Sequence, residues 1–456
     1  MHSDGVKGKE SGFSDRLGFI LASAGSAVGL GNIWRFPYLA AKYGGGIFLL
    51  TYLILAVTVG FSLSLAEVAL GRKTGRSSAT AFGSLDRRFS FLGYLNILVP
   101  ILVIPYYSVV GGWVVKYAVS YIVGEGSALA ADGYFEGYTK GVVEPLAFFL
   151  IFAVVTVLTV LLGVKGGVEK ISKLLMPPLL ILTVFIAVFT VATTEGSLEG
   201  VKYYLLPNFE SFSVMTVVAA LGQLFYSMSI AMGTLVTFGS YTSREIDIEK
   251  SVRYVEIFDT GIAFLSGFMI IPAVFAFFGE SAAHSEGAPL MFITLPKIFV
   301  SMPMGGVIGA VFFIMVTLAA LTSNIALAEA FVAMIADRFR IKRKTALLVS
   351  LAVFVILGIP SALGYGVLGG VKLLGLTILE LFDFLASNLL MPVIALFTVI
   401  FIGYVIKPKA LIDEIEESGR FKHKRLFTTV IRYLAPPIIG VILVTSFLEL
   451  FGVIKI

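Results

Sequence analysis

Asp259 is the charged residue with the strongest chemical implication, because it lies inside a long apolar segment. An ionisable group within a membrane costs several kcal/mol when unpaired, so it marks a candidate ion or proton site. The alternative is that the helix begins later and Asp259 is interfacial. The chain has no Cys and only three His, all in expected loops or termini. This excludes thiol chemistry and argues against a His-based metal centre or triad.

Two apolar segments carry small and polar residues at mid-membrane depth. Residues 24–32 include three Gly, and residues 223–233 interrupt a later segment at similar depth. Such residues disfavour a continuous helix, and unwound backbone there is tolerated only in a cavity or inside protein. Freed carbonyls can ligate a cation, and half-helix N-termini can receive a carboxylate. Close helix packing through small residues is the alternative for either segment alone.

These residues require a membrane scaffold to position them. The chain is 58% hydrophobic and 14% charged over 456 residues, whereas a soluble domain has about 25% charged residues. A spanning helix needs about 20 mostly apolar residues. The pattern predicts an all-α protein with eleven spans, at 15–39, 45–70, 91–123, 144–163, 168–193, 213–241, 254–278, 305–336, 345–364, 372–405 and 427–452.

The two interrupted segments are the first and the sixth of these spans. Matched broken helices five spans apart predict a 5+5 inverted repeat in a single transmembrane domain. Repeat one covers about 15–193, repeat two about 213–405, and an additional helix about 427–452. We expect residues 290–300 to be a re-entrant or capping segment, and residues 407–426 to form a surface helix.

Lys and Arg gather in alternate loops, which predicts a cytoplasmic N-terminus in the inner membrane of a cell. We assign the net charge of +5 to these loops, and therefore expect lipid contacts but no nucleic-acid partner. No nucleophile–base set, metal cluster or phosphate loop is evident, so we predict no enzyme. A monomer and a homodimer are both compatible with the sequence.

Several motifs resemble the neurotransmitter:sodium symporter family across essentially the whole chain. They are residues 15–22, 28–38 and 44–46, Glu67 with Gly71-Arg72, Tyr106-Tyr107 with Trp113, and residues 223–241, 292–296 and 321–323. The resemblance implies the LeuT-type fold with broken helices 1 and 6 and sodium-coupled uptake of a small amino acid. Many relatives have a twelfth span, and shorter bacterial members are known.

The resemblance also implies two sodium sites. The first comprises the Ala27 carbonyl, Asn32, Ser227 and Asp259, together with the substrate carboxylate. The second comprises the carbonyls of Gly25, Val28 and Ala319 and the hydroxyls of Thr322 and Ser323. Without the resemblance, these two hydroxyls would be expected to bond back to their own helical turn.

The implied substrate lies between the broken helices. Gly31 and Tyr107 would receive its carboxylate, and carbonyls near Ala27 and Tyr226 its ammonium. The expected binding residues are Ala27, Gly31, Val103, Tyr107, Tyr226, Ser227, Ser229, Met232, Ser323 and Leu327. Monoamine carriers have Asp where this chain has Gly29, which favours a substrate with its own carboxylate. Ala231 replaces a common Gly, and its methyl group should shrink the pocket or stiffen the broken segment.

The resemblance places gates on both sides of this pocket. Outside, Arg35 and Asp383 would pair near Gln223, although Arg35 could instead snorkel to the interface. Inside, Asp337 and Tyr241 match the family. Glu10 stands where an Arg is expected, which leaves Lys7 or Lys9 as the basic partner, and Phe13 replaces a Trp. Gly167 and Pro177 have the spacing that lets similar bacterial members unwind this helix end, although an ordinary Pro kink is the alternative.

We therefore predict that the protein transports Na⁺ together with a small or medium apolar L-amino acid, by alternating access. Two sodium ions are expected. Ala263 stands where many bacterial members carry Glu, and Asp259 would supply the missing charge, so chloride should not be required. One alternative is a proton-coupled carrier using Asp259 or Glu67, and another is a receptor or channel. We expect Glu67 and Arg72 to form a structural pair at a helix end.

Overall fold

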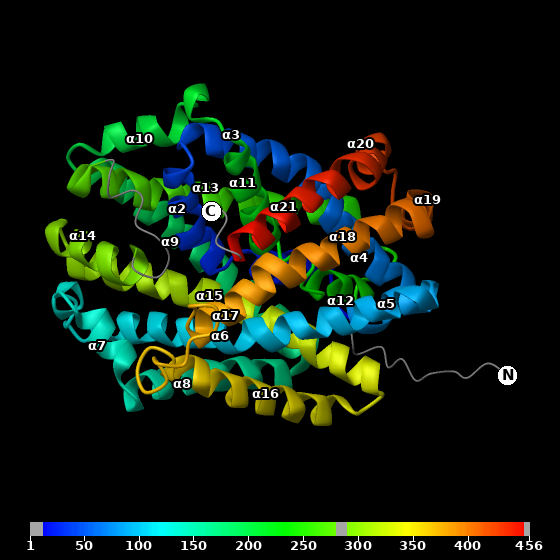
Figure 1. Cartoon of the computed structure of the whole chain (residues 1–456), viewed down its shortest axis with the longest axis horizontal. Coiled ribbons are helices and arrows are strands. Elements are labelled where there is room, and N and C mark those ends of the chain that lie inside the picture. The colour runs from blue at the N-terminus through cyan, green and yellow to red at the C-terminus, as the bar shows by residue number, and fades with distance from the viewer. Residues whose placement is uncertain (1–11, 280–289, 451–456) are drawn as a thin grey trace.

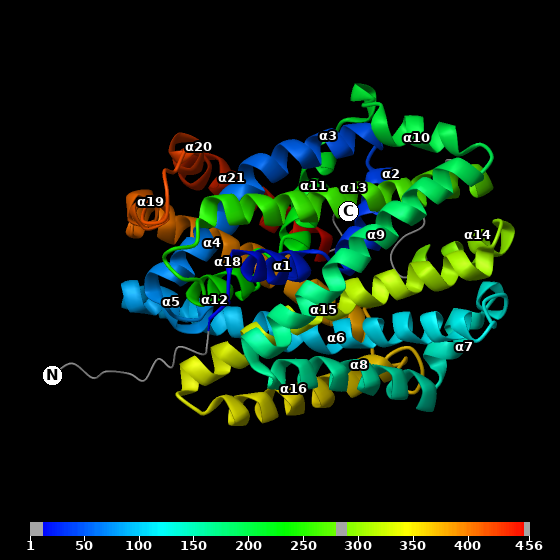
Figure 2. The same ribbon diagram turned by 180° about the vertical axis from the view of Figure 1, so that it is seen from behind.

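The computed structural model describes residues 12–279 and 290–450, and within these ranges the chain is helical with no strand. Most of the long helices run side by side along one direction (Figure 1), and the reverse view shows the same alignment (Figure 2). The predicted all-helical membrane architecture is confirmed at this level.

The N-terminal half contains a helix broken near its middle and four long helical stretches. Its α-helices and short π-helical segments (η) are α1 (Arg16–Ala27), η1 (Gly31–Arg35), α2 (Phe36–Lys42), α3 (Gly46–Leu55), η2 (Ala56–Gly60), α4 (Phe61–Thr74), α5 (Ser78–Leu85), α6 (Ser90–Ile122), α7 (Tyr134–Lys140), α8 (Val143–Leu161), η5 (Val164–Glu169), α9 (Lys170–Thr193) and α10 (Ser197–Leu205).

The C-terminal half also begins with an interrupted helix. Its elements are α11 (Val214–Ser227), α12 (Thr234–Ser240), α13 (Ile248–Phe278), η8 (Leu290–Thr294), α14 (Leu295–Ser301), α15 (Gly305–Phe339), α16 (Arg343–Leu363), α17 (Ile378–Asp383), η9 (Phe384–Leu390), α18 (Met391–Ile400), η10 (Phe401–Val405), α19 (Pro408–Glu416), α20 (Lys424–Thr429), η11 (Val430–Leu434) and α21 (Ala435–Leu450). α19 falls within the segment expected to form a surface helix.

Within the described ranges, nine helices are long and apolar enough to cross a membrane, or up to ten with a bent pair. That pair is Arg16–Ala27 with Gly31–Lys42, bent by 54°. The predicted sixth span, 213–241, is divided between α11 and α12, each too short to count alone. The short apolar helix Leu290–Ser301 matches the expected re-entrant or capping segment.

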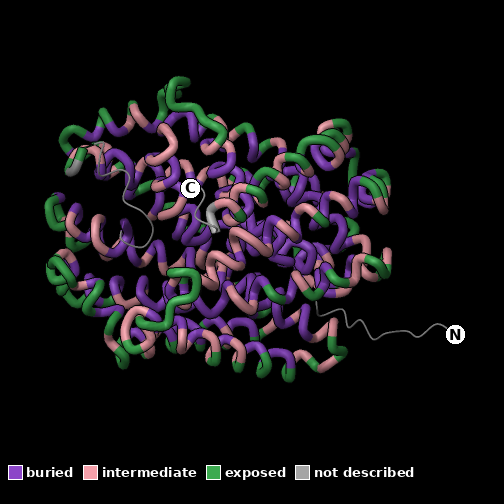
Figure 3. Tube along the Cα trace, in the orientation of Figure 1, coloured by how far each residue is buried: buried purple, intermediate pink, exposed green. Residues whose placement is uncertain are grey.

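Burial follows the pattern expected of helices in lipid. Buried residues line the middle of the molecule, and exposed ones gather on its outer helices and ends (Figure 3). On the outer helices the exposed residues are often large and apolar, such as Leu158, Ile181 and Ile356. Apolar side chains on this outer surface are favourable in contact with lipid acyl chains and unfavourable in contact with water.

α4 and α12 approach until their backbones touch. A Cβ built on Gly71 would lie 1.8 Å from the Val236 carbonyl oxygen, and one on Gly239 would lie 2.2 Å from the Val68 carbonyl oxygen. Only glycine permits such an approach, because any larger side chain would overlap the opposite backbone. The two helices therefore share a direct backbone contact.

The N-terminus of α13 is fixed by its cap. The Asp247 side chain accepts a hydrogen bond from the Lys250 amide at 3.0 Å, as an N-cap carboxylate should. Partial burial raises the pKa of Asp247, but the amide and ammonium of Lys250 outweigh it and leave that pKa below its ordinary value. This cap defines the start of the helix that carries Asp259.

Candidate functional site

The first broken helix ends because its backbone leaves the helical conformation at Val28. α1 stops at Ala27, and Val28 is extended, with φ −74° and ψ 104°. The helical path resumes with η1 at Gly31. The break exposes backbone groups at the centre of the molecule, as the glycine-rich run predicts.

The second break contains three residues in the left-handed region. Ser229, Ala231 and Gly233 have φ of 54°, 62° and 76°, between the end of α11 and the start of α12. The buried Glu67 carboxylate stabilises this segment, because its Oε1 accepts a hydrogen bond from the Ala231 amide at 2.9 Å. The expected Glu67–Arg72 pair is therefore wrong, since Arg72 instead forms a buried ion pair with Glu414 at 2.9 Å.

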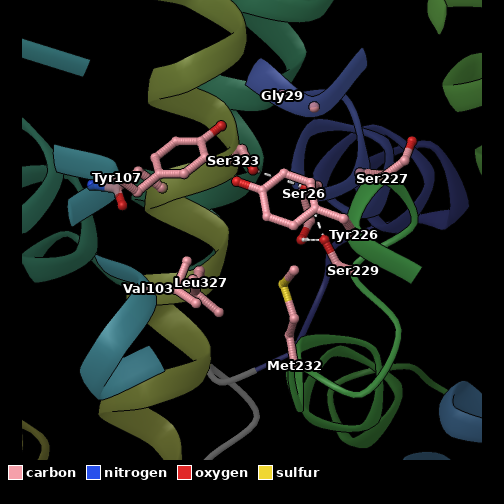
Figure 4. A pocket seen from close by; sticks show the side chains of 13 residues that line it. Ser26, Gly29, Val103, Tyr107, Tyr226, Ser227, Ser229, Met232, Ser323 and Leu327 are labelled. Atoms are coloured by element: carbon pink, nitrogen blue, oxygen red, sulfur yellow. Dashed lines mark hydrogen bonds between the residues drawn. The ribbon is translucent and has the colours of Figure 1, made fainter. Parts of the chain in front are cut away.

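One pocket lies between the two breaks. α6 and α15 supply one side of it, while the broken segments supply the other (Figure 4). Its wall includes all ten residues expected to bind substrate, namely Ala27, Gly31, Val103, Tyr107, Tyr226, Ser227, Ser229, Met232, Ser323 and Leu327. Ser26, Gly29 and Asn324 also line it.

Gly29 leaves little room for any side chain. A Cβ at this position would lie 2.6 Å from the Tyr107 hydroxyl oxygen and 3.0 Å from the Ser323 hydroxyl oxygen. The Tyr107 hydroxyl accepts a hydrogen bond from the Leu30 amide at 3.1 Å and can still donate one. A carboxylate in the pocket could accept this hydrogen bond and would then lie beside the exposed backbone of the break.

Ser26 joins the two breaks, a role that sequence reasoning missed. Its carbonyl accepts hydrogen bonds from the Ser229 hydroxyl at 3.0 Å and the Ser323 hydroxyl at 2.9 Å. Its own hydroxyl donates to that of Ser229 at 3.2 Å. Its position beside Gly25, in the run of small residues, could have indicated this role, because a hydroxyl there lies next to backbone groups that the break leaves unpaired.

Three of the residues expected at the first sodium site form one buried cluster. The Ser227 hydroxyl donates to Asp259 Oδ1 at 2.6 Å, and Asn32 Nδ2 donates to the same oxygen at 2.7 Å. All three are at most 1% exposed, and Tyr52 approaches Asp259 Oδ2 at 3.4 Å. The Asn32 amide directs its oxygen to the Gly29 amide at 3.1 Å. Rotation of this amide would present that oxygen to an ion beside Asp259.

Two of the residues expected at the second sodium site, Gly25 and Thr322, lie against each other, but the two expected hydroxyls differ. A Cβ on Gly25 would lie 3.2 Å from Thr322 Cβ, so the two helices are in contact there. Thr322 donates to the carbonyls of Leu318 and Ala319 at 3.0 and 3.1 Å, which is the bond to its own turn named above as the alternative. Ser323 instead reaches across to the first broken helix. Val28 lies in that break.

The expected outer gate residues each contact a tyrosine rather than each other. Arg35 lies over the Tyr226 ring, 5.2 Å from its centre. Asp383 Oδ1 accepts hydrogen bonds from Tyr106 at 2.7 Å and Ser387 at 2.9 Å. The expected contact of Arg35 with Asp383 is therefore not present.

Gln223 is also part of this end of the pocket. Its Nε2 donates to the Gly31 carbonyl at 2.9 Å, which ties α11 to η1. Its oxygen is buried and has no hydrogen-bond partner in the described structure.

The inner gate residues have partners that sequence reasoning missed. The Tyr241 hydroxyl donates to Glu329 at 3.2 Å, and Arg343 binds the same fully buried carboxylate at 2.5 Å. Asp337 Oδ2 instead accepts hydrogen bonds from the Ser77 and Thr80 hydroxyls at 2.7 and 2.5 Å.

Phe13 packs edge-on against the Tyr241 ring, at 6.2 Å between ring centres. The candidate partners Lys7 and Lys9, and Glu10, lie outside the described residues. Glu329 sits inside a long apolar helix, which was a usable signal for a functional carboxylate.

Comparison with known proteins decides the family. The model of the sodium:neurotransmitter symporter family matches residues 10–125 and 140–453. The chain is a member of this family. The symporter is therefore a sodium-dependent membrane transporter, and its family consists of transporters rather than enzymes.

Similar proteins align with the symporter over nearly its whole length. The uncharacterised sodium-dependent transporter YhdH of Bacillus subtilis is 34% identical over 97% of this chain and 98% of its own. The crystal structure of MhsT in complex with L-phenylalanine superposes with a TM-score of 0.87 at 34% identity, over 96% of this chain and 100% of that one. The human sodium- and chloride-dependent GABA transporter 2 is 27% identical, over 93% of this chain and 78% of its own.

Proposed function

We propose that the symporter imports a small or medium apolar L-amino acid together with Na⁺. The observation that carries this proposal is the pocket between the two broken helices, which adjoins the oxygen-rich cluster of Asn32, Ser227 and Asp259. Sodium prefers oxygen ligands, and a substrate carboxylate in this pocket would add one more. Binding of the ion and the amino acid would then be mutually reinforcing.

Recognition of the amino-acid backbone follows from the polar groups of the breaks. The Tyr107 hydroxyl and the amides near Gly31 would bind the carboxylate, while carbonyls near Ala27 and Tyr226 would accept hydrogen bonds from the ammonium. Gly29 provides no acidic side chain to pair with the amine of a ligand, and a Cβ there would lie 2.6 Å from the Tyr107 hydroxyl oxygen. This favours a substrate that brings its own carboxylate into this part of the pocket.

The substrate side chain would lie among apolar groups. Val103, Met232 and Leu327 line the same pocket and offer no hydrogen-bonding side-chain group. Ala231 lies in the break next to Met232 and is not one of the residues that line the pocket, so its methyl group should act by stiffening the broken segment. MhsT has been crystallised with L-phenylalanine, so an aromatic substrate is the main competitor to the smaller ones proposed here.

We further propose eleven spans in a 5+5 inverted repeat, with a cytoplasmic N-terminus. α11, the break and α12 together would form the sixth span, matching the bent first one. Two sodium ions would bind, one beside Asp259 and one between Gly25 and Thr322. Alternating access would then expose the same pocket to each side of the membrane in turn.

Uptake into proteoliposomes tests the proposal. With an inward sodium gradient, a labelled apolar amino acid such as leucine should accumulate above its external concentration, and potassium in place of sodium should abolish accumulation. Competition by each of the twenty amino acids gives the substrate range. Binding without concentrative uptake would instead identify a receptor or channel.

A proton-coupled carrier is the second candidate, because Glu67 Oε2 is buried with no hydrogen-bond partner in the described structure. An inward proton gradient without sodium would then drive uptake. Thermal stabilisation of the purified protein by sodium, at constant pH and ionic strength, favours the first candidate. The absence of both stabilisation and sodium-driven uptake would favour the second.

A further inference from the structure

A second crevice lies outside the transport pocket, between α3–α4, α13 and the start of α20. Counted together with the open space at its mouth, it spans about 1,220 Å³, and the proposed transport mechanism does not use it. Its lining residues are Leu53, Val57, Phe61, Arg253, Glu256, Ile257, Thr260, Gly261, Phe264, His423 and Leu426. Val57 and Ile257 are each 58% exposed, so the crevice opens on the outer, apolar surface of the molecule.

Glu256 gives this crevice a polar centre. The residue is 6% exposed, and its Oε1 is buried without a hydrogen-bond partner in the described ranges. The hydroxyl of Thr260, one helical turn further along α13, is buried and unpartnered in the same part of the structure. A buried carboxylate oxygen without a donor costs free energy, so this position is built to receive one.

A basic group lies one turn before Glu256 on α13. Arg253 contacts His423 Nδ1 at 2.9 Å and Glu249 Oε1 at 3.3 Å, and its guanidinium lies 5.3 Å from the centre of the Phe61 ring. The Arg253 side chain is 44% exposed, so its remaining donors can reach a ligand outside the protein.

The rest of the crevice is apolar. Leu53, Val57, Ile257, Phe264 and Leu426 line it. The occupant must therefore combine an apolar body with a head that offers both a hydrogen-bond donor and an anionic acceptor. A zwitterionic head group with an ammonium can satisfy both Arg253 and Glu256, whereas a purely anionic head group offers no cation to the buried Glu256 side chain.

We propose that this crevice binds a phospholipid with a primary ammonium head group, which is phosphatidylethanolamine. Its ammonium donates to Glu256 Oε1, its phosphate lies toward Arg253 and His423, and an acyl chain follows Val57 and Ile257. Phosphatidylcholine carries the same phosphate, but its trimethylated ammonium has no N–H to donate. The Glu256 carboxylate is thus the group that distinguishes phosphatidylethanolamine from phosphatidylcholine.

Native mass spectrometry of the full-length, delipidated protein in detergent tests this proposal. Phosphatidylethanolamine, phosphatidylcholine and phosphatidylglycerol with identical acyl chains are titrated separately. The wild type should bind the first at least tenfold more tightly than the other two. Glu256→Gln should reduce the ethanolamine-over-choline preference to about twofold or less, since an amide is neutral. Glu245→Gln, an exposed carboxylate outside the crevice, should keep it.

A second variant makes the test independent of how well Glu256→Gln folds. Ile257→Trp changes an exposed residue and fills the mouth of the crevice, so it should lower phosphatidylethanolamine binding at least fivefold without altering the polar groups. Equal binding of all three lipids by the wild type would mean non-selective surface lipid only, and would overturn the proposal. Tighter binding of phosphatidylglycerol, or an unchanged preference in Glu256→Gln, would overturn it as well.

Discussion

The hydroxyls of Thr322 and Ser323 are adjacent in sequence but serve different helices. Thr322 bonds to its own turn, whereas Ser323 bonds to the Ser26 carbonyl across the pocket. A hydroxyl that donates to a carbonyl keeps its oxygen lone pairs, so it can still ligate a cation. The observed bonds are therefore compatible with the proposed second sodium site, and only a sodium titration separates the two roles.

Replacing both Thr322 and Ser323 with Ala should weaken the sodium dependence of substrate binding at least tenfold, which is about 1.4 kcal/mol. Substrate binding is measured at increasing sodium concentration. Thr317→Ala is the matched control, because its hydroxyl also bonds back along α15, to Phe313 at 2.7 Å, and lies outside the pocket. An unchanged sodium titration in the double variant would remove these hydroxyls from the ion site.

Asp259 should compensate the positive charge of sodium, because a net charge in a buried site is costly. Asp259→Asn should lower uptake in chloride-free buffer by about tenfold, equivalent to about 1.4 kcal/mol, and added chloride should restore part of it. Wild-type uptake should be unaffected when gluconate replaces chloride. Collapse of wild-type uptake in gluconate would instead assign the counter-charge to a bound anion.

At the scale of elements, Ala231 is the constrained position of the α11–α12 break. Its φ of 62° is unfavourable for alanine but not for glycine. Ala231→Gly should therefore be tolerated, and without the methyl group the break next to Met232, which lines the pocket, should adapt more easily to large side chains. Aromatic amino acids should then compete about tenfold better against labelled leucine.

Ala220→Gly is the control for this prediction, since Ala220 is also buried but lies within helical α11 and not in the break. It should lower stability without changing the substrate range. A wild-type protein that already prefers Trp over Leu would contradict the steric argument for Ala231.

The long spans were predictable because unbroken apolar runs have one stable form in a bilayer, which is a helix. The predicted span 144–163 is observed as Val143–Leu161, and 345–364 as Arg343–Leu363. The region 213–241 was predicted as a single span with a break, and the structure divides it into α11 and α12. Hydropathy alone does not show where a broken helix resumes, because that depends on local φ and ψ.

The pocket residues were predictable where a motif placed them, but their pairings were not. Glu329 and Arg343 are 14 positions apart on different helices, so only the turn between α15 and α16 brings them together. Ser26 was missed for a similar reason, because its contacts are 203 and 297 positions away. Side-chain pairings across helices depend on rotation and register, which a single sequence does not specify.

At the scale of the whole molecule, Arg72 fastens α4 to α19. Its ion pair with Glu414 is 1–2% exposed, and the same guanidinium donates to the Ile246 carbonyl at 2.9 Å. Glu414→Ala should leave a buried uncompensated charge and lower the free energy of unfolding by about 3–5 kcal/mol. Reversible denaturation in detergent measures this change.

Arg72→Met combined with Glu414→Leu should recover much of that loss, because it removes both charges. Glu199→Ala, in an exposed pair with Lys202, should have no measurable effect. Similar stability of Glu414→Ala and the wild type would show that water reaches the Arg72 guanidinium.

The glycine contacts between α4 and α12 limit how the protein can move during a transport cycle. Gly71 and Gly239 leave no layer of side chains between the two backbones, so these helices cannot slide past each other without steric overlap. The two helices should therefore move together as one rigid body. Spin labels at Lys73 on α4 and Ser240, the last residue of α12, should keep the same separation with and without sodium, while labels at Lys73 and Phe91 on α6 should change theirs. A change in the distance between the first pair of labels would mean that α4 and α12 move relative to each other.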